Sequence, residues 1–363
     1  MRMTTVLPRR RVGLAALLFS AALLASCAGL KKTPETTGTA TPNAVPLPVL
    51  PEPLTGQNNV QAFIEHMVST QGFDRTQLTA LFKQVKPRPR IVQIMTTPAE
   101  SKPWNVYRRI FITAARIQGG VAFWHENAPA LARAESQYGV PAAIIVAIIG
   151  VETRYGDNMG SFPVIDALST LAFDYPPRAD YFRGELEQFL LLSREEQLDP
   201  LAPKGSYAGA MGEAQFMPSS YRKFSVDFDG DGKRDLWHST PDAIGSIANY
   251  LSAHGWQRGQ PIALRARIDG NGYQNLLDPS LKKPERSIAQ FKAAGVMPEG
   301  NADDTRPAIL VRLETDDDAE YWLGLDNFYA ITRYNHSPRY AMAVYQLSQE
   351  IVAQHAGTAA PSP

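Results

Sequence analysis

Glu152 is the side chain best placed to act as a general acid. It follows residues 142–149, which are apolar at every position and come after Pro141, a residue suited to a first helical turn. A helix that is apolar on all faces is buried in a core or lies in a membrane, and a membrane span needs about 20 such residues. We therefore expect a buried helix that ends near Glu152.

A carboxyl group at that helix end is predicted to keep its proton. Burial favours the neutral form of Glu152, and the negative end of the helix dipole acts in the same direction, so both raise its pKa. A carboxyl group still protonated near neutral pH is what general-acid catalysis requires. The alternative is a half-exposed glutamate that pairs with Arg154 or another basic residue.

Regularly spaced aspartates predict a cation site. In residues 227–235, aspartates stand at loop positions 1, 3, 5 and 9 and a glycine at position 6, as in the first half of an EF-hand. Lys233 would contribute only its carbonyl, and His238 stands where calcium needs a carboxylate. Asp242 could close a lengthened loop. We expect weak calcium binding, and the alternative is an acidic Asp-Gly turn.

Residues 205–218 are rich in glycine and alanine. Such a run lets the backbone approach a ligand closely. Tight packing between helices would require the same small residues, so the composition alone leaves both interpretations open.

Apolar periodicity predicts a mainly α fold of the α+β class around these residues. Asp74 and Gln77 are spaced as in a capping box, ahead of a helix that ends before Pro87. Alternation predicts a small antiparallel sheet from residues 262–268, 308–314 and 320–325. Helical spacing is found in residues 58–70, 104–118, 128–138, 180–193, 242–254, 284–294 and 340–353.

Length and charge limit the classes of function. The chain has 363 residues, with 36 basic and 36 acidic side chains, so it can hold two or three subdomains around one core. A neutral chain lacks the excess of basic residues that nucleic-acid binding requires, so we expect no nucleic-acid partner. We expect a monomer.

Residues 1–26 are predicted to be an export signal, with a basic start, a short apolar stretch and a small-residue end. Cys27, the only cysteine, follows Leu24-Ala25-Ser26, which resembles a bacterial lipobox and implies a lipid on Cys27. Ala28 stands where an aspartate would favour the inner membrane. We therefore expect a lipoprotein at the periplasmic face of the outer membrane; the alternative is an ordinary signal peptide.

Composition also predicts the domain boundaries. Residues 27–57 are rich in proline and threonine and form a flexible tether. Helical periodicity continues to residue 256, alternation then indicates a β subdomain at 257–325, helix returns within 326–355, and a disordered tail is expected at 356–363.

Five motifs together resemble the membrane-bound lytic murein transglycosylase B family. They occur in the family's order and spacing, and the resemblance covers residues 58–355. The motifs are Gly-Val-Glu-Thr-Arg-Tyr-Gly at 150–156, Phe-Asp-Tyr-Pro-Pro-Arg at 173–178, Gly-Ala-Met-Gly-Glu-Ala-Gln-Phe-Met-Pro-Ser-Ser-Tyr at 209–221, Asp-Ala-Ile-Gly-Ser-Ile-Ala-Asn-Tyr at 242–250 and Arg-Tyr-Asn-His-Ser at 333–337.

The resemblance implies a goose-lysozyme-like catalytic core at 131–256 with the aspartate loop at 227–242, flanked by an α-helical subdomain at 58–130 and the β subdomain at 257–325, with residues 326–355 returning to the core. It also implies cleavage of the β-1,4 bond between N-acetylmuramic acid and N-acetylglucosamine in the glycan strands of peptidoglycan. The product would carry a 1,6-anhydromuramoyl end, and the chemistry would need no cofactor. Glu152 matches the family's only catalytic acid. The residues that match its saccharide groove are Tyr107, Arg178, Tyr181, Ser206, Gln215, Tyr250, Tyr334 and Tyr340.

The same resemblance implies a structural calcium ion. The matching ligands are Asp227, Asp229, Asp231, Lys233 through its carbonyl, and Asp242. This chain departs from the family pattern by one extra residue before Asp242, and Asp229 stands where a serine is also found.

Two other functions stay open at this level. A hydrolytic muramidase on the same fold would need a second carboxylate to hold a water, with Asp157, Asp166 and Asp174 as candidates. A non-catalytic, calcium-dependent wall-binding lipoprotein would explain the anchor and the aspartate loop. It would not explain a carboxyl group at the end of a buried helix.

Overall fold

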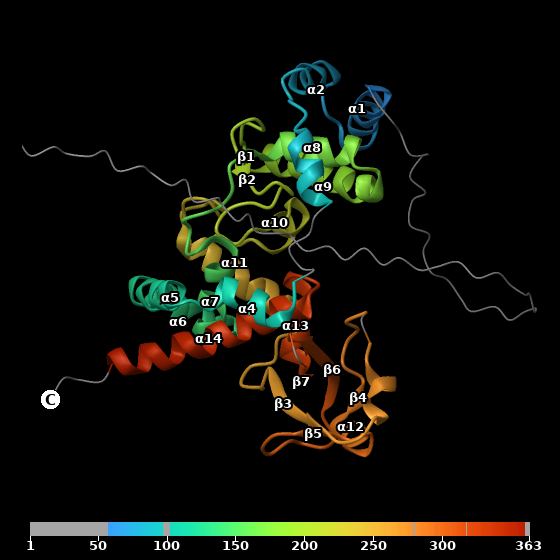
Figure 1. The fold of residues 1–363 in the computed structure, drawn as a ribbon. Coiled ribbons are helices and arrows are strands. Elements are labelled where there is room, and N and C mark those ends of the chain that lie inside the picture. The colour runs from blue at the N-terminus through green and yellow to red at the C-terminus, as the bar shows by residue number, and fades with distance from the viewer. Residues whose placement is uncertain (1–56, 97–101, 279, 317, 360–363) are drawn as a thin grey trace, which may run out of the picture.

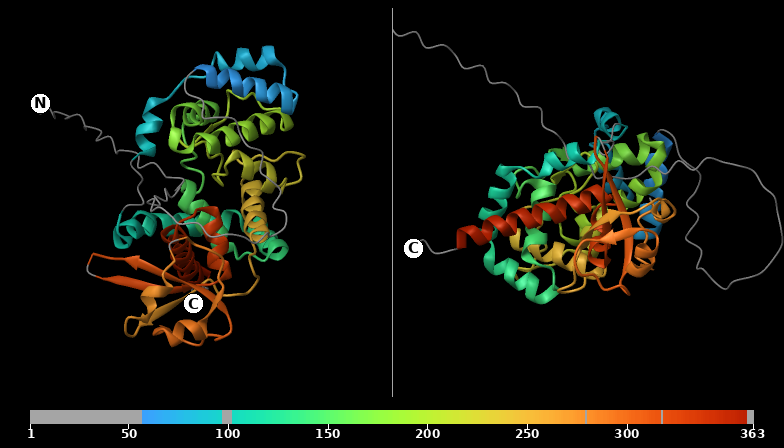
Figure 2. Two further views of the ribbon diagram at one scale, coloured as in Figure 1. Left: turned by 90° about the vertical axis from the view of Figure 1, so that its right-hand side faces the viewer. Right: turned by 60° about the horizontal axis from the view of Figure 1, so that its bottom comes forward.

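The fold is taken from a computed structural model that describes residues 57–96, 102–278, 280–316 and 318–359. The predicted export signal, Cys27 and most of the tether lie outside the described residues. The molecule has three layers along its length, with helices at one end, a helical core in the middle and a β-sheet at the other end (Figures 1 and 2).

The first layer is built from two separate parts of the chain. Helices α1 (Gln57–Gln71), α2 (Arg75–Phe82) and α3 (Pro89–Met95) lie beside α8 (Val164–Asp174) and α9 (Ala179–Glu195). The side chain of Asp74 accepts a hydrogen bond from the backbone N–H of Gln77 at 2.8 Å, so it caps α2 as its position in the sequence predicts.

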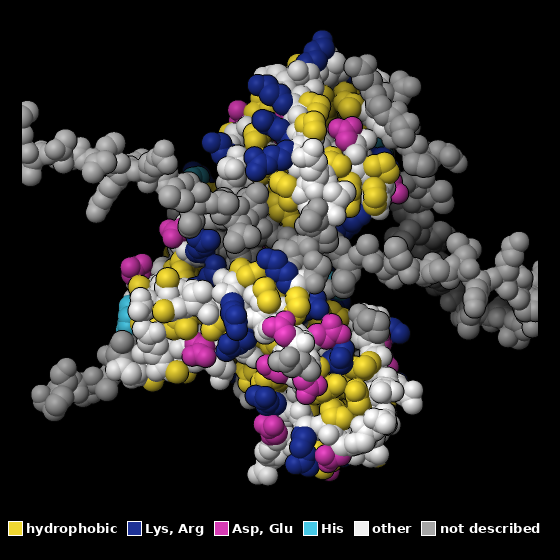
Figure 3. All heavy atoms as spheres, viewed as in Figure 1, with side chains coloured by type: hydrophobic (Ala, Val, Ile, Leu, Met, Phe, Trp, Pro, Cys, Tyr) yellow, Lys and Arg dark blue, Asp and Glu magenta, His cyan; other side chains and the backbone are white. Residues whose placement is uncertain are grey.

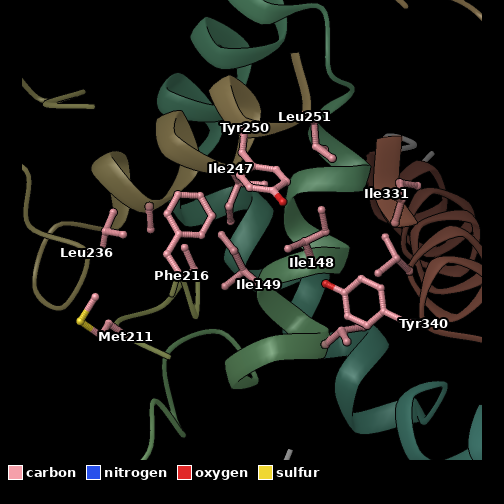
Figure 4. Close-up of a cluster of buried hydrophobic side chains, with 14 of the residues drawn as sticks. Ile148, Ile149, Met211, Phe216, Leu236, Ile247, Tyr250, Leu251, Ile331 and Tyr340 are labelled. Carbon is pink, nitrogen blue, oxygen red and sulfur yellow. The ribbon is translucent and has the colours of Figure 1, made fainter. Parts of the chain in front are cut away.

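Helix α7 (Ala142–Thr153) is the centre of the core. Every one of its residues is buried except Glu152, as the apolar run predicts. It packs against α5 (Ala114–Glu126), α6 (Ala128–Tyr138), α11 (Thr240–Ala253) and the long α14 (Pro338–Ala359). Figure 4 shows Ile148 and Ile149 of α7 in one hydrophobic cluster with Phe216, Ile247 and Tyr340.

The helix expected over residues 104–118 is broken in the structure. Helix α4 (Trp104–Phe111) ends at Ile112, and α5 begins after Thr113, whose side chain accepts a hydrogen bond from the N–H of Arg116 at 3.2 Å. Both halves are amphipathic, so periodicity alone does not separate them; the break comes from the extended backbone of Thr113 at the cap.

The third layer is a five-stranded antiparallel sheet in the order β4-β6-β7-β3-β5. Its long strands, β3 (Ala263–Ile268), β6 (Pro307–Glu314) and β7 (Ala319–Gly324), lie where alternation predicts them. The helix expected near 284–294 is shorter: β4 (Arg286–Ser287) precedes α12 (Ile288–Ala293) and β5 (Val296–Pro298) follows it. The predicted mainly α fold with a small antiparallel sheet is confirmed.

The remaining elements connect the layers. Strands β1 (Phe162–Pro163) and β2 (Lys204–Gly205) form a short antiparallel pair. Between and after them come η2 (Pro176–Arg178), α10 (Pro218–Phe224), η3 (Gly272–Leu276) and α13 (Asp326–Tyr334). None of the described helices is long and apolar enough to cross a membrane alone; α6 and α7 reach the required length only as a pair bent by 115°.

Candidate active site

The end of α7 is fixed by a tyrosine that lies against three glycines. The hydroxyl of Tyr155 donates a hydrogen bond to the carbonyl of Arg116 on α5 at 2.7 Å. A Cβ added at Gly119, Gly120 or Gly150 would lie within 2.9 Å of an atom of the Tyr155 side chain. The glycines therefore form a slot for this ring, and the slot holds the residues next to Glu152 against α5.

Glu152 opens into a small cavity together with residues that are distant in the sequence. The cavity has a volume of about 80 Å³. At about 30 Å³ for a water molecule in the liquid, this is room for a few water molecules or a small polar group. Four predicted groove residues line it beside Glu152: Ser206, Gln215, Tyr250 and Tyr334.

Burial controls the protonation of Glu152. Its carboxyl group is enclosed by protein, which raises the pKa to about 7, and a hydrogen bond from Tyr340 acts in the opposite direction. The Tyr340 hydroxyl donates to Oε1 of Glu152 at 2.6 Å, and the ring of Tyr340 is buried. The predicted rise in the pKa of Glu152 is confirmed, so the group holds its proton up to about neutral pH.

Replacing Tyr340 with phenylalanine is expected to move the alkaline limb of the pH–activity profile upward by about one pH unit. The tyrosine hydroxyl stabilises ionised Glu152, so without it burial acts alone and the pKa of Glu152 rises further. The measurement is kcat/KM between about pH 5 and about pH 9. Tyr138→Phe, a half-buried position on α6, is the control. A limb that stays in place or moves down would contradict this reading of the hydrogen bond.

The other tyrosines of the site are held by backbone carbonyls. The hydroxyl of Tyr334 donates to the carbonyl of Ala214 at 2.5 Å, and the hydroxyl of Tyr250 donates to the carbonyl of Arg333 at 2.6 Å. The rings of Tyr334 and Tyr340 are parallel within 8°, with centroids 6.4 Å apart. Since each hydroxyl hydrogen is already used, these oxygens are left to accept hydrogen bonds from a ligand.

The glycine-rich segment positions two more polar groups. Gln215 has a left-handed backbone with a φ of 49°, and its side-chain N–H groups donate to the carbonyls of Met159 and Gly212. Ser206 accepts hydrogen bonds from the N–H groups of Ala208 and Ala210. Because these bonds use the amide nitrogen of Gln215 and the oxygen of Ser206, an acceptor and a donor respectively are left for a ligand.

Besides Tyr340, three predicted groove residues are absent from the lining of this cavity. Tyr107 is buried on α4, close enough to Tyr340 to raise its pKa. Arg178 lies over the ring of Tyr181, with the guanidinium carbon 4.4 Å from the ring centroid. Neither Arg178 nor Tyr181 lines the cavity at Glu152.

Asn335 was missed by the sequence reasoning although it lies inside the motif at 333–337. It lines the cavity, and its Oδ1 is buried without a hydrogen-bond partner among the described residues. A buried acceptor without a partner is costly, so this atom is suited to a ligand hydroxyl. Other lining residues that were not singled out are Ala210, Phe216, Met217 and Ser220, all within or next to the motif at 209–221.

The aspartate loop brings together three of the five expected metal ligands. Asp227, Asp229 and Asp242 each place a carboxylate oxygen within 4.8 Å of the others. Asp242 is fully buried, and its two oxygens accept backbone N–H groups that fix their position. Asp231 stands apart from this group, with its Oδ1 on the N–H of Lys233 at 2.9 Å. Clustered carboxylate oxygens are ligands that suit calcium.

Two of the acids considered for a hydrolytic reaction are placed elsewhere. Asp166 is buried on α8 and forms an ion pair with Arg88 at 2.7 Å. Asp174, at the end of α8, lines a separate cavity between α1, α2 and α8. Asp157 is near the end of α7 but does not line the cavity at Glu152. Glu152 is therefore the only carboxylate among the described residues that line this cavity.

Comparison with known proteins gives one consistent family. Residues 55–349 match the family model described as "Transglycosylase SLT domain". A curated relative, membrane-bound lytic murein transglycosylase B of Escherichia coli, is 47% identical over 350 residues, which are 91% of this chain and 94% of the relative.

Solved structures agree with that match. A lytic transglycosylase of Escherichia coli in complex with calcium is 47% identical, with a TM-score of 0.75 over 85% of this chain and 100% of the other. SltB3 from Pseudomonas aeruginosa in complex with NAG-NAM-pentapeptide is 32% identical, with a TM-score of 0.72 over 83% of this chain and 81% of the other. The chain therefore belongs to the transglycosylase SLT domain family and is a lytic transglycosylase.

Proposed function

We propose that this enzyme cleaves the β-1,4 bond between N-acetylmuramic acid and N-acetylglucosamine in peptidoglycan and leaves a 1,6-anhydromuramoyl end, with Glu152 as the only acid and base. The observation that carries this proposal is the protonated carboxyl group of Glu152, with a pKa of about 7, beside a cavity that holds no second carboxylate among its described lining residues.

Two steps with one proton account for the reaction. Glu152 gives its proton to the glycosidic oxygen, which leaves with the electron pair of its bond to the anomeric carbon. The muramoyl ring becomes an oxocarbenium-like cation, assisted by its own N-acetyl oxygen. The 6-hydroxyl of the same ring then attacks the anomeric carbon and returns its proton to Glu152, so the enzyme ends in its starting state.

A single carboxylate is enough because the nucleophile belongs to the substrate. Ordinary glycosidases use two carboxylates, one of which acts on a water or on the sugar. Here the attacking hydroxyl is already attached to the reacting ring, and a well-oriented intramolecular group has a large advantage over free water.

The aromatic side chains around the cavity are inferred to hold the sugar rings. Tyrosine faces stack on sugars, and their hydroxyls exchange hydrogen bonds with sugar hydroxyls. Tyr250 and Tyr334, which line the cavity, lie nearest to the reacting bond in this proposal, with the buried Tyr340 behind them on Glu152. Arg178 and Tyr181 would contact the strand further along. A sugar hydroxyl could donate a hydrogen bond to Oδ1 of Asn335, which has no partner among the described residues.

Mass spectrometry of digested peptidoglycan tests the proposal. Purified sacculi are incubated with the enzyme, and the soluble products are separated. Products with 1,6-anhydromuramoyl ends, each lighter by one water than the hydrolysed form, are the expected result. Reducing ends would favour a hydrolytic muramidase, and the absence of products would favour a wall-binding lipoprotein.

We infer that calcium, where present, stabilises the loop of residues 227–242 and takes no part in the reaction. Asp227, Asp229 and Asp242 would hold it, and α11, which begins directly behind the loop, would be fixed in place. The support for this inference is the set of clustered oxygens and the calcium complex of the Escherichia coli relative.

Calcium is expected to raise the thermal midpoint of the protein and a chelator to lower it. An ion at 100 times its Kd adds about 2.7 kcal/mol to the free energy of unfolding. Differential scanning fluorimetry measures the shift. Asp227→Asn should remove it, whereas Asp278→Asn, an exposed aspartate in the third layer, should keep it. A midpoint that does not respond to calcium in the native chain would refute the inference.

The lipobox-like sequence places the enzyme at the periplasmic face of the outer membrane in this proposal, with a lipid on Cys27 and residues 27–57 as the tether. The folded part would act as a monomer that reaches glycan strands from the membrane. Replacing Cys27 with alanine should release the protein from the membrane fraction. Retention of that variant in the membrane fraction would contradict the anchor.

A further inference from the structure

Another cavity opens between α4, α14 and the five-stranded sheet, and we call it the α4–sheet pocket. Its volume of about 440 Å³ is in the range of sites for small ligands. The residues that matter for its chemistry are Trp104, Arg108, Arg109, Arg265, Glu320 and Trp322. Figure 3 shows basic, acidic and hydrophobic side chains together on the face where α4 and α14 meet the sheet.

Two arginines of this pocket have guanidinium N–H groups that are available to a ligand. Within the described parts of the chain, Arg109 forms no hydrogen bond or ion pair. Arg265 is held only loosely, with Nε 3.9 Å from Glu299 and its guanidinium carbon 5.9 Å from the centroid of Trp322. A guanidinium presents a planar pair of N–H groups that matches a carboxylate, so both side chains are suited to a ligand with a free carboxylate.

The acids of the pocket limit the kind of anion. Glu320 and Glu350 line it together with the arginines, and Glu320 accepts a hydrogen bond from Nε1 of Trp322 at 3.3 Å. These carboxylates repel a ligand with several negative charges, such as a polyphosphate or a nucleic acid. A short peptide with one terminal carboxylate and neutral or positive groups elsewhere matches the pocket. Its carboxylate suits the arginines, and the rest of the peptide is not repelled by the glutamates.

Polar atoms without partners also fit a peptide backbone. Trp104 is 1% exposed, and its indole Nε1 has no hydrogen-bond partner among the described residues. Oδ1 of Asn105 is also buried and has no hydrogen-bond partner there. A peptide carbonyl would accept from the Trp104 indole, and a peptide N–H would donate to Asn105. Trp322 and Tyr345, with ring centroids 6.3 Å apart at 88°, supply apolar wall for the peptide side chains.

A series of side-chain contacts links the α4–sheet pocket to the site at Glu152. The rings of Trp104 and Tyr107 are stacked with centroids 6.3 Å apart, and Tyr107 is close enough to Tyr340 to raise its pKa. Tyr340 in turn donates to Glu152. A pentapeptide extends to about 17 Å, and in the proposal below this length joins the pocket to a sugar near Glu152.

We propose that the α4–sheet pocket binds the carboxylate end of a peptide attached to the glycan strand, and that the enzyme thereby processes peptide-bearing strands in preference to bare ones. This inference rests on the proposed cleavage of peptidoglycan. It assigns Arg109 and Arg265 to the terminal carboxylate and Trp104 and Asn105 to the peptide backbone.

A comparison of two substrates tests the preference. Glycan strands that carry their peptides, and the same strands after an amidase has removed them, are digested by the native chain and by Arg109→Ala/Arg265→Ala. Loss of two charged hydrogen-bonding groups is expected to lower kcat/KM for peptide-bearing strands about tenfold to a hundredfold, while bare strands are cleaved as before. Arg267→Ala, an exposed arginine on the same strand as Arg265, is the matched control.

The possible failures separate cleanly. If the native chain cleaves both substrates equally well, or if the double variant loses activity on both, the peptide site is refuted and the proposed cleavage stands. If the native chain cleaves neither, the proposed function itself has failed.

Direct binding gives a second, independent test. A synthetic pentapeptide with a free terminal carboxylate is titrated into the native chain, and the tryptophan fluorescence is followed. Its terminal amide, which lacks the charge, is expected to bind about tenfold more weakly or worse. Equal affinity of the acid and the amide, or no binding of the acid, would overturn the assignment of the arginines.

Discussion

Replacing Glu152 with glutamine is expected to abolish cleavage, with a loss at the upper end of the range of about 10²- to 10⁴-fold that general acid–base groups contribute. Glutamine keeps the shape of the side chain but has no proton to give to the leaving oxygen. The same group also takes back the proton of the attacking hydroxyl, so both halves of the proposed reaction fail. The measurement is the release of anhydro products from purified sacculi.

Glu213→Gln is the matched control for this variant. Glu213 is another buried glutamate of the core whose pKa is raised by burial, but it does not line the cavity at Glu152. Its side chain accepts a hydrogen bond from Thr240, which glutamine can keep. Near-native activity of Glu152→Gln, or an equal loss in both variants, would mean that another group supplies the proton.

The same substitution has an expected effect on stability with a definite sign. The pKa of Glu152 is about 7 in the folded protein, above its ordinary value of 4.5, so the folded state binds the proton more tightly. The contribution of Glu152 to the free energy of unfolding is therefore fully present below about pH 4.5 and is lost as the pH rises toward 7. Glutamine removes this dependence, and the variant should be more stable at pH 8 by about 1–3 kcal/mol, measured by urea denaturation.

Replacing Gly160 with alanine is expected to lower the free energy of unfolding by about 3 kcal/mol or more. Gly160 has a φ of 96°, and an added Cβ would lie 2.0 Å from the carbonyl oxygen of Gly205 and 2.5 Å from the backbone nitrogen of Ser206. Both contacts are to backbone, so no side chain can move aside. The shift would displace Ser206 from the catalytic cavity, and activity should fall together with stability.

Gly255→Ala separates the two causes of that loss. Gly255 has a similar φ of 90°, but nothing lies within 4 Å of an added Cβ. Its substitution should therefore show only the backbone strain, about 1–2 kcal/mol. Urea denaturation of both variants gives the difference, and similar values for the two would mean that the β1–β2 pair tolerates the added methyl group.

Helix α7 could be predicted because its signal is local. Residues 142–149 are apolar on every face, and this pattern alone requires burial and places Glu152 at the boundary of the core. The strands of the third layer were equally clear, since alternation along β3 and β6 matches the burial of one face. The break between α4 and α5 could not be predicted, because amphipathic residues continue across it.

The partners of Glu152 could not be found from local patterns. Tyr340 lies 188 residues further along the chain, and its hydrogen bond to Glu152 depends on how α14 packs against α7. It was named only through the family resemblance. Asn335 stood inside a quoted motif, yet nothing in its residue type indicates a buried oxygen without a partner.

The slot for Tyr155 makes three glycines depend on one ring. Adding a methyl group at Gly119 or Gly150 displaces the same aromatic side chain, and at Gly120 it displaces both this ring and the side chain of Ile351. Once the ring has moved, a second methyl group should cost much less than it would alone, so the effects of double variants should be far from additive. Alanine at all three positions is thus expected to cost less than the sum of the three single substitutions. A triple variant with a smaller residue at position 155 is the natural starting point for redesign of the helix end.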